Sequence, residues 1–77
     1  MYERPQRLAP KLKAIRQRLG VSQTGMKQLL MFAGNYGRIS EFERGRRQPN
    51  IVTILRYARL AGLPMDDLVD DEIELKF

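Results

Sequence analysis

A short segment in the middle of the chain combines a helix stop with several hydrogen-bond donors. The donor side chains are those of Arg44, Arg46, Arg47 and Gln48. The planar guanidinium of arginine matches the oxygen geometry of phosphates, and side-chain amides also donate to them. Gly45 is the residue type that most readily ends a helix in a left-handed conformation. We therefore expect a helix that ends near Arg44, followed by a loop that contacts phosphates, although such a loop is also typical of a solvated turn.

The charge is distributed unevenly along the 77 residues. Residues 1–62 carry a net charge of +10 and residues 63–77 carry −5, which gives +5 overall. A cationic body of this density favours a polyanionic partner, most often nucleic acid. The alternative is a helical domain whose charged faces only keep it in solution, and Lys11, Lys13 and Arg18 are expected to be charges of this second kind.

Several protein classes are disfavoured by the composition. The chain has no cysteine and no histidine, so it lacks the usual zinc ligands, catalytic bases and thiol nucleophiles. We therefore expect neither an enzyme nor a bound metal or cofactor. The apolar runs are far shorter than the roughly 20 residues that cross a bilayer, and residues 1–5 do not resemble a secretory signal. A cytoplasmic protein with no membrane partner is expected.

Apolar residues at helical spacing predict five helices, over residues 10–19, 23–30, 36–44, 51–61 and 65–69. Their expected caps are Ser22, Asn35 and Asn50, and their expected stops are Gly20, Gly45 and Gly62. The residues at apolar helical spacing are Leu8, Leu12, Ile15 and Leu19, then Met26, Leu29 and Leu30, then Ile51, Ile54, Leu55, Ala58 and Ala61, with Leu68 in the last helix. After this last helix, residues 72–77 alternate polar and apolar, which favours a short edge strand over helix; a frayed acidic tail is the alternative.

The helix expected over residues 36–44 has two different sides. At 100° per residue, one side carries Ile39, Phe42 and Glu43, and the opposite side carries Gly37, Ser40, Glu41 and Arg44. The first side is suited to a core. The second side is the candidate face for a DNA groove, since the amino-terminal half of a recognition helix approaches base edges most closely.

The triplet Glu43-Arg44-Gly45 and the pair Ser22-Gln23 resemble the phage-repressor and Cro type of helix-turn-helix family, also called the xenobiotic-response-element family. The resemblance implies an all-α, five-helix domain of the lambda-repressor type over residues 8–70, with 71–77 as an acidic tail or short strand. It also implies sequence-specific binding of double-stranded DNA by a transcriptional regulator. Such domains usually act as homodimers, and the fifth helix with Ile73, Leu75 and Phe77 offers the expected contact surface.

By this resemblance, the base-reading positions fall on Tyr36, Gly37 and Glu41, with Arg38 and Ser40 beside them. Their chemistry suits base edges: Arg38 matches guanine, Glu41 accepts from cytosine, and Tyr36 packs on a thymine methyl or reaches a phosphate. Gly37 either allows close backbone approach or only weakens the helix. The full set of base-reading candidates is Asn35, Tyr36, Gly37, Arg38, Ser40 and Glu41.

Contacts to the DNA backbone are expected at the start of the second helix and after the third. The resemblance assigns Gln23 a bracing role there, and amides at that helix start attract phosphate; an exposed polar residue without a role is the alternative. The remaining backbone candidates are Arg44, Arg46, Arg47, Gln48 and Asn50. The resemblance also pairs Arg16 with Glu43, as a structural ion pair.

A second function remains open from the sequence. The same scaffold suits a protein-interaction module, such as an antitoxin or an adaptor, whose acidic C-terminal tail binds a basic protein partner. RNA binding is less favoured, because no exposed aromatic platform for base stacking is evident.

Overall fold

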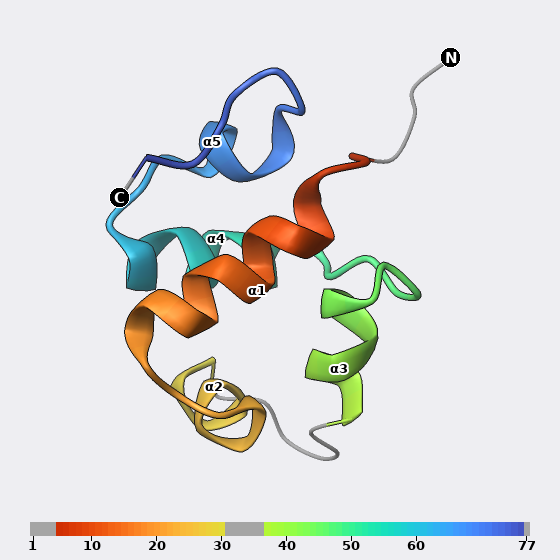
Figure 1. Ribbon diagram of the computed structural model, residues 1–77, viewed down its shortest axis with the longest axis vertical. Coiled ribbons are helices and arrows are strands. Elements are labelled where there is room, and N and C mark those ends of the chain that lie inside the picture. Colours follow the sequence, from red (N-terminus) through yellow and green to blue (C-terminus); the bar gives the residue numbers. More distant parts are fainter. Residues whose placement is uncertain (1–4, 31–36, 77) are drawn as a thin grey trace.

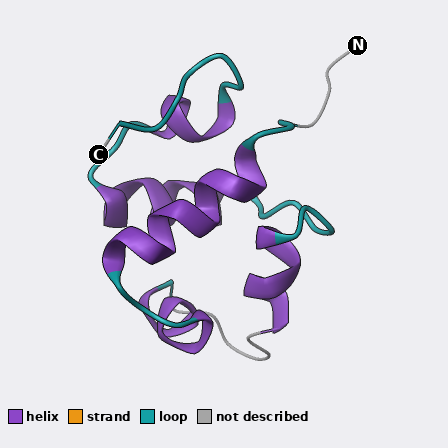
Figure 2. Ribbon diagram, in the orientation of Figure 1, coloured by secondary structure: helices purple, strands orange, loops and turns teal. Residues whose placement is uncertain are grey.

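The computed structural model describes residues 5–30 and 37–76, which form five helices: α1 (Leu8–Leu19), α2 (Gln23–Leu29), α3 (Gly37–Glu43), α4 (Ile51–Ala61) and α5 (Met65–Val69). Helix α1 crosses the middle of the molecule with α4 behind it, while α2 and α3 lie on one side and α5 on the other (Figure 1). All regular structure in the described residues is helical (Figure 2). The expected all-α, five-helix fold is confirmed.

The expected stops and two of the expected caps are present. Gly20, Gly45 and Gly62 have φ values of 73°, 73° and 70°, the left-handed conformation that follows a helix. The hydroxyl of Ser22 accepts from the Gly25 amide at 3.0 Å, and Asn50 Oδ1 accepts from the Thr53 amide at 2.8 Å. Asn35, the third expected cap, lies outside the described residues.

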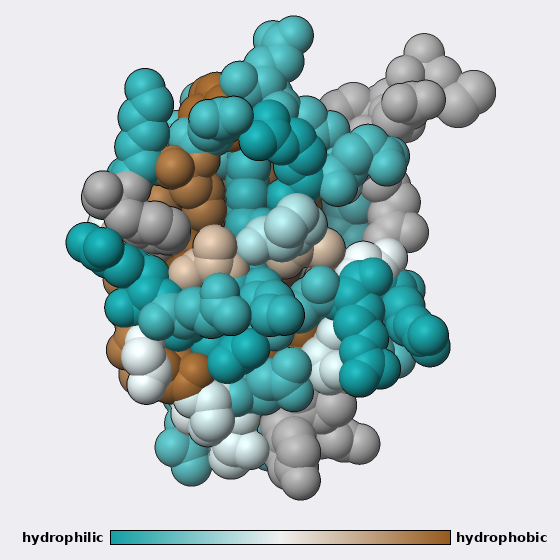
Figure 3. Space-filling model, viewed as in Figure 1, coloured by the Kyte–Doolittle hydropathy of each residue, from teal (hydrophilic) through white to brown (hydrophobic). Residues whose placement is uncertain are grey.

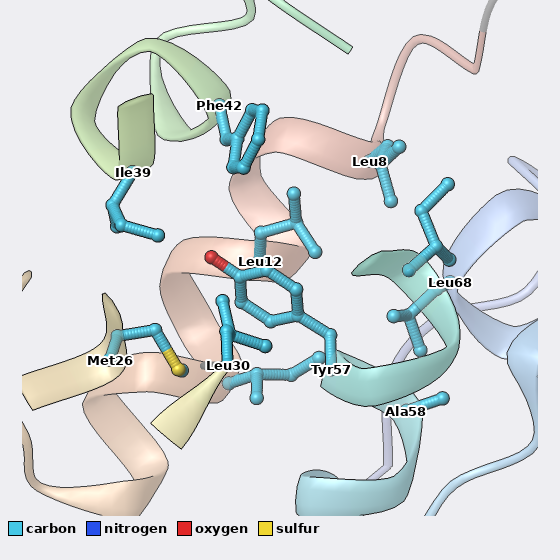
Figure 4. Close-up of a cluster of buried hydrophobic side chains, with 11 residues drawn as sticks. Leu8, Leu12, Met26, Leu30, Ile39, Phe42, Tyr57, Ala58 and Leu68 are labelled. Atoms are coloured by element: carbon cyan, nitrogen blue, oxygen red, sulfur yellow. The ribbon is translucent and has the colours of Figure 1, made fainter. Parts of the chain in front are cut away.

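The core is a single cluster that draws side chains from all five helices. Tyr57 of α4 lies at its centre, between Leu12 of α1 and the inward side of α3 (Figure 4). Its members are Leu8, Leu12, Ile15, Met26, Leu30, Ile39, Phe42, Ile54, Tyr57, Ala58 and Leu68. Burial of these apolar side chains is the main source of stability, because α2, α3 and α5 are too short to persist alone.

Two of the expected stripes are corrected by the structure. Leu29 in α2 is 43% exposed, and Ile51 and Leu55 in α4 are 67% and 37% exposed. In α4 the buried side instead carries Thr53, Ile54, Tyr57 and Ala58. The spacing of apolar residues over the eleven residues of α4 is compatible with either of two adjacent helix faces being buried. The face that carries Tyr57 is the buried one, because its large ring fills the centre of the core.

Lys11 also departs from expectation. It is buried, and its ammonium donates to the carbonyls of Asp67 at 2.6 Å and Asp70 at 2.8 Å. These carbonyls belong to the last turn of α5 and the residue after it, where the helix leaves acceptors unpaired. Burial lowers the pKa of Lys11, chiefly by desolvating its charged form. Lys11 is therefore a structural link between α1 and α5, while Lys13 and Arg18 are exposed as expected.

The expected C-terminal strand is absent from residues 72–76. This segment lies on the domain itself, with Leu75 packed against the core and Asp71 bonded to the amides of Gln6 and Arg7. A strand needs a neighbour for its backbone groups, and these contacts instead fold the segment onto α5 and the start of α1. Phe77 lies outside the described residues.

Candidate nucleic-acid interface

Helix α3 presents two chemically different faces. Ile39 and Phe42 are buried in the core, and the Glu43 side chain is only 4% exposed. On the other side, Arg38 and Arg44 are exposed, while Ser40 and Glu41 are half-buried. Gly37 is the first residue of α3, and the candidates Asn35 and Tyr36 lie outside the described residues. The structure thus places Arg38, Ser40, Glu41 and Arg44 on the side of α3 that faces away from the core.

Glu43 holds the first three helices together. Its carboxylate accepts from Arg16 Nε at 2.7 Å and Nη2 at 3.1 Å, so the ion pair expected between these residues is present and bidentate. Arg16 also donates to the carbonyl of Val21, between α1 and α2, at 3.0 Å. The hydrogen bond to Glu43 raises the pKa of Arg16 further. Each side chain thereby has a partner of opposite charge at a place where an unpaired buried charge would be costly.

Gln23 joins the same cluster. Its side-chain amide donates to Glu43 Oε1 at 3.3 Å, which sequence reasoning did not anticipate. This bond connects the first residue of α2 to the last residue of α3. Gln23 is half-buried and sits beside the Ser22 cap, so its expected position at the start of α2 is confirmed, and its contact with DNA remains a prediction.

The loop after α3 is a basic surface beside the outer face of α3. Arg44, Arg46, Arg47 and Gln48 are all exposed, while Pro49 is buried and anchors the loop. On this side of the molecule, strongly hydrophilic side chains project into solvent, whereas apolar side chains gather at the opposite edge, where α1 and α4 end (Figure 3). The loop therefore has the exposure that contacts with phosphates require.

Two loop residues make contacts that limit their expected roles. Arg47 Nε donates to Glu41 Oε1 at 3.3 Å, so a candidate for the DNA backbone pairs with a candidate for base reading. Asn50 uses its side-chain oxygen to cap α4. A shallow groove of about 190 Å³ lies between them, lined by Arg38, Phe42, Arg47, Gln48, Pro49, Asn50 and Thr53.

Sequence reasoning missed one residue that positions this side of the molecule. Arg56 of α4 donates from Nη1 to the carbonyl of Leu30 at 2.9 Å, at the end of α2. A cation at a helix carboxyl end is favourable, because the last carbonyls lack partners within the helix. The only available signal was a basic residue at the edge of a buried helical stripe, which does not identify its partner.

Other kinds of site find no support in the described ranges. Within residues 5–30 and 37–76, no three acidic side chains gather as potential metal ligands. In the same part of the chain, no helix combines the length and apolar character that spanning a membrane requires.

Comparison with known proteins agrees with this arrangement. The helix-turn-helix family model matches residues 12–68, which is most of the chain. The fold is similar to that of the P22 c2 repressor protein, solved in complex with synthetic operator 9T in the presence of Tl⁺, with a TM-score of 0.72 at 20% sequence identity; the match covers 83% of this chain and 94% of that one. A comparison with curated proteins gives no match. The chain belongs to the helix-turn-helix family of the phage-repressor and Cro type, a family of DNA-binding transcriptional regulators.

Proposed function

We propose that the chain reads a specific duplex sequence by placing the outer face of α3 in the major groove of DNA. The observation that carries this proposal is the orientation of α3: Ile39 and Phe42 anchor it in the core, and its opposite side carries the exposed Arg38 and Arg44 and the half-buried Ser40 and Glu41. An α-helix fits the major groove, where each base pair presents a distinct pattern of donors and acceptors. The P22 c2 repressor, which shares the fold, was solved with an operator.

The two sets of candidate residues divide the work. Arg38, Ser40 and Glu41 face the groove, where arginine and glutamate side chains discriminate between bases by their hydrogen bonds. The basic loop (residues 44–50) directly follows α3, and Gln23 at the start of α2 bonds to Glu43 at the end of α3; both segments would contact the phosphates that flank the groove. Such contacts release condensed counterions, which supplies affinity but no sequence information.

The salt dependence of binding tests the phosphate contacts. A complex of two chains with roughly 6 to 10 phosphate contacts should lose about 10³ to 10⁵ in affinity between 50 and 200 mM salt. Arg46→Ala removes one exposed cation from the basic loop of each chain, two per complex, and should reduce the slope of log K against log salt by about 2.

Lys76→Ala is the matched control. It removes the same charge from the exposed C-terminal segment, which lies on the opposite side of the molecule from the basic loop (Figure 1). We expect the Lys76→Ala slope to equal that of the unchanged chain. Equal slopes for all three proteins, or a salt response close to zero, would contradict the assignment.

A homodimer on DNA is the second part of the proposal, and the burial of residues expected at its contact surface favours a different surface for it. Leu68 is buried and Leu75 packs on the chain's own core, so the surface expected from the sequence is largely used within one chain. Ile51, Val52 and Leu55 of α4 remain exposed instead. They directly follow the basic loop, so pairing of a second copy across them by a two-fold axis would bring the two basic loops near each other.

Charge also favours a second copy at this surface, which we call the α4 patch (Ile51, Val52 and Leu55). Residues 1–62 carry +10, so two copies tolerate contact best through side chains without charge, as these three are. Three partly exposed side chains offer far less than the roughly 800 Å² per partner of a standard interface. The pairing would therefore be weak in free solution and strengthened when DNA holds both copies.

The remaining expectations follow from the DNA partner. A chain that acts by binding DNA requires no catalytic group, and this one has neither histidine nor cysteine to supply one. Because its proposed partner is DNA, we expect the protein to act in the cytoplasm. Binding of another protein by the acidic tail is the weaker proposal, because the Asp71 carboxylate already accepts from two amides of its own chain.

A further inference from the structure

Arg47 and Glu41 form one unit on the surface that faces DNA. Arg47 Nε lies 3.3 Å from Glu41 Oε1, and the two side chains are 52% and 47% exposed. Glu41 belongs to the outer face of α3, and Arg47 belongs to the basic loop that follows it. The contact therefore joins the part of the surface that would read bases to the part that would hold phosphates.

The backbone builds this contact. Gly45, with φ of 73°, reverses the chain after α3, and the amides of Arg46 and Arg47 both donate to the Glu41 carbonyl, at 2.9 and 3.3 Å. Residue 47 is thereby held over residue 41 before either side chain is placed. Exposed ion pairs are usually weak, since two long side chains must be ordered together; here the turn has already fixed one end of each.

A carboxylate on a DNA-reading face needs such a neighbour. Glu41 alone would approach the phosphates as a like charge, which is unfavourable at short range. With Arg47 beside it, the local charge is balanced and the carboxylate is oriented. A carboxylate has about four acceptor positions, so one hydrogen bond from Arg47 leaves others for a base.

We propose that Arg47 is a positioning residue that holds the Glu41 carboxylate for cytosine, so that the pair determines specificity at one base position. The acceptor matches the exocyclic N4 amino group of cytosine, which donates in the major groove. This inference rests on the proposed function. It differs from the role expected from the sequence, in which Arg47 only clamps a phosphate.

Selection from a randomised duplex library at fixed salt separates the two roles. Four proteins are compared: the unchanged chain, Glu41→Ala, Arg47→Ala and Arg46→Ala. The unchanged chain should prefer cytosine at one position by about 5- to 150-fold, the discrimination typical of one good base contact. Glu41→Ala and Arg47→Ala should both lose this preference at the same position and keep the others.

Arg46→Ala is the matched control, because its residue is the exposed arginine next in sequence. It should weaken binding to all duplexes alike and leave the cytosine preference intact. If Arg47→Ala instead behaves like Arg46→Ala, Arg47 is a phosphate clamp and the inference is overturned. If Arg47→Ala selects no sequence while Glu41→Ala does, the positioning role is also overturned. If the unchanged chain selects no sequence at all, the proposed function itself fails.

Discussion

Glu43 shows how much of the fold depends on a single side chain. One buried carboxylate accepts from Arg16 of α1 and from Gln23 of α2, while its own helix is α3. These bonds set α2 and α3 against each other next to the candidate interface. The Arg16 contact was expected from the resemblance, because Glu43 precedes Arg44-Gly45 and lies on the inward side of its helix. The Gln23 contact depends on how α2 begins in space, which residue types alone do not specify.

Tyr57 provides a residue-scale prediction about stability. Its ring is fully buried, its hydroxyl points towards Ile39 (Figure 4), and this oxygen has no hydrogen-bond partner among the described residues. Burial raises the pKa of Tyr57, because the phenolate would be poorly solvated. Tyr57→Phe removes the unpaired hydroxyl and keeps the ring, so we expect a gain of about 1 kcal/mol in the free energy of unfolding.

Thermal unfolding measures this change. A gain of that size raises the melting temperature by about 4–8 °C in a domain this small. Tyr57→Ala is the control for sensitivity, since the cavity it leaves should cost about 3–5 kcal/mol. A clear loss of stability in Tyr57→Phe would mean that the hydroxyl is hydrogen-bonded after all.

At the scale of elements, α1 is capped from the far end of the sequence. Arg7, at the N-cap position, makes no side-chain cap bond. The Asp71 side chain provides this cap instead: its carboxylate accepts from the amides of Gln6 at 2.8 Å and Arg7 at 2.9 Å. Arg7 in turn donates to the Asp71 carbonyl at 2.8 Å, and Lys11 binds the end of α5. The C-terminal segment is thus part of the folded unit, and the expected domain limits of 8–70 remain a prediction.

This cap predicts an acid-dependent contribution to stability. The two amide hydrogen bonds, from Gln6 and then Arg7, lower the pKa of Asp71 from its ordinary value of 3.8. A depressed pKa in the folded state means that the contribution is fully present above pH 3.8 and is lost as the pH falls through the folded pKa. Asp71→Asn removes the titrating group, so the difference in unfolding free energy between the two chains should shrink below this pH.

Urea unfolding at several pH values between 6 and 2.5 follows that difference. The other carboxylates are common to both proteins, so their titration cancels in the comparison. Glu72→Gln, at an exposed neighbouring carboxylate, is the control and should give a small difference at every pH. A constant difference between Asp71→Asn and the unchanged chain across the whole range would show that the carboxylate charge does not stabilise the cap.

The sequence predicted the elements better than the contacts between them. Local signals, such as the Ser22 cap and the Gly45 stop, act within a few residues and were read correctly. The α4 stripe was partly wrong, because Ile51 and Leu55 fit the helical period as well as Tyr57 does, and only packing decides. The pairing of Arg47 with Glu41 depends on the turn at Gly45, so its geometry was not readable from residue types.

At the scale of the whole molecule, the charges are segregated in space as well as in sequence. The acidic C-terminal segment packs on α5 and the start of α1, while α3 lies on the other side of α1 from α5 (Figure 1). An asymmetric charge distribution of this kind orients a protein as it approaches a polyanion. The acidic residues therefore favour encounters in which α3 faces the DNA.

The dimer proposal is tested at this same scale. The double variant Ile51→Gln with Leu55→Gln makes the α4 patch polar without adding charge, and glutamine favours helix. On a duplex with two half-sites, the unchanged chain should bind cooperatively as two copies, and the variant should bind one copy at a time. Sedimentation of the complexes distinguishes these outcomes. A chain that lacks residues 72–77 is the comparison. If this deletion abolishes self-association while the α4 double variant still binds as two copies, the interface lies at the C-terminal segment and not at the α4 patch.

The most direct test of the central claim maps the DNA contact on the protein. Amide chemical shifts of the labelled chain are followed as a selected duplex is added. We predict that the largest changes fall on residues 37–50 and at the start of α2, with little change in α5. Changes concentrated in α5 and residues 70–76, with α3 unaffected, would contradict the assignment of α3 as the helix that reads DNA.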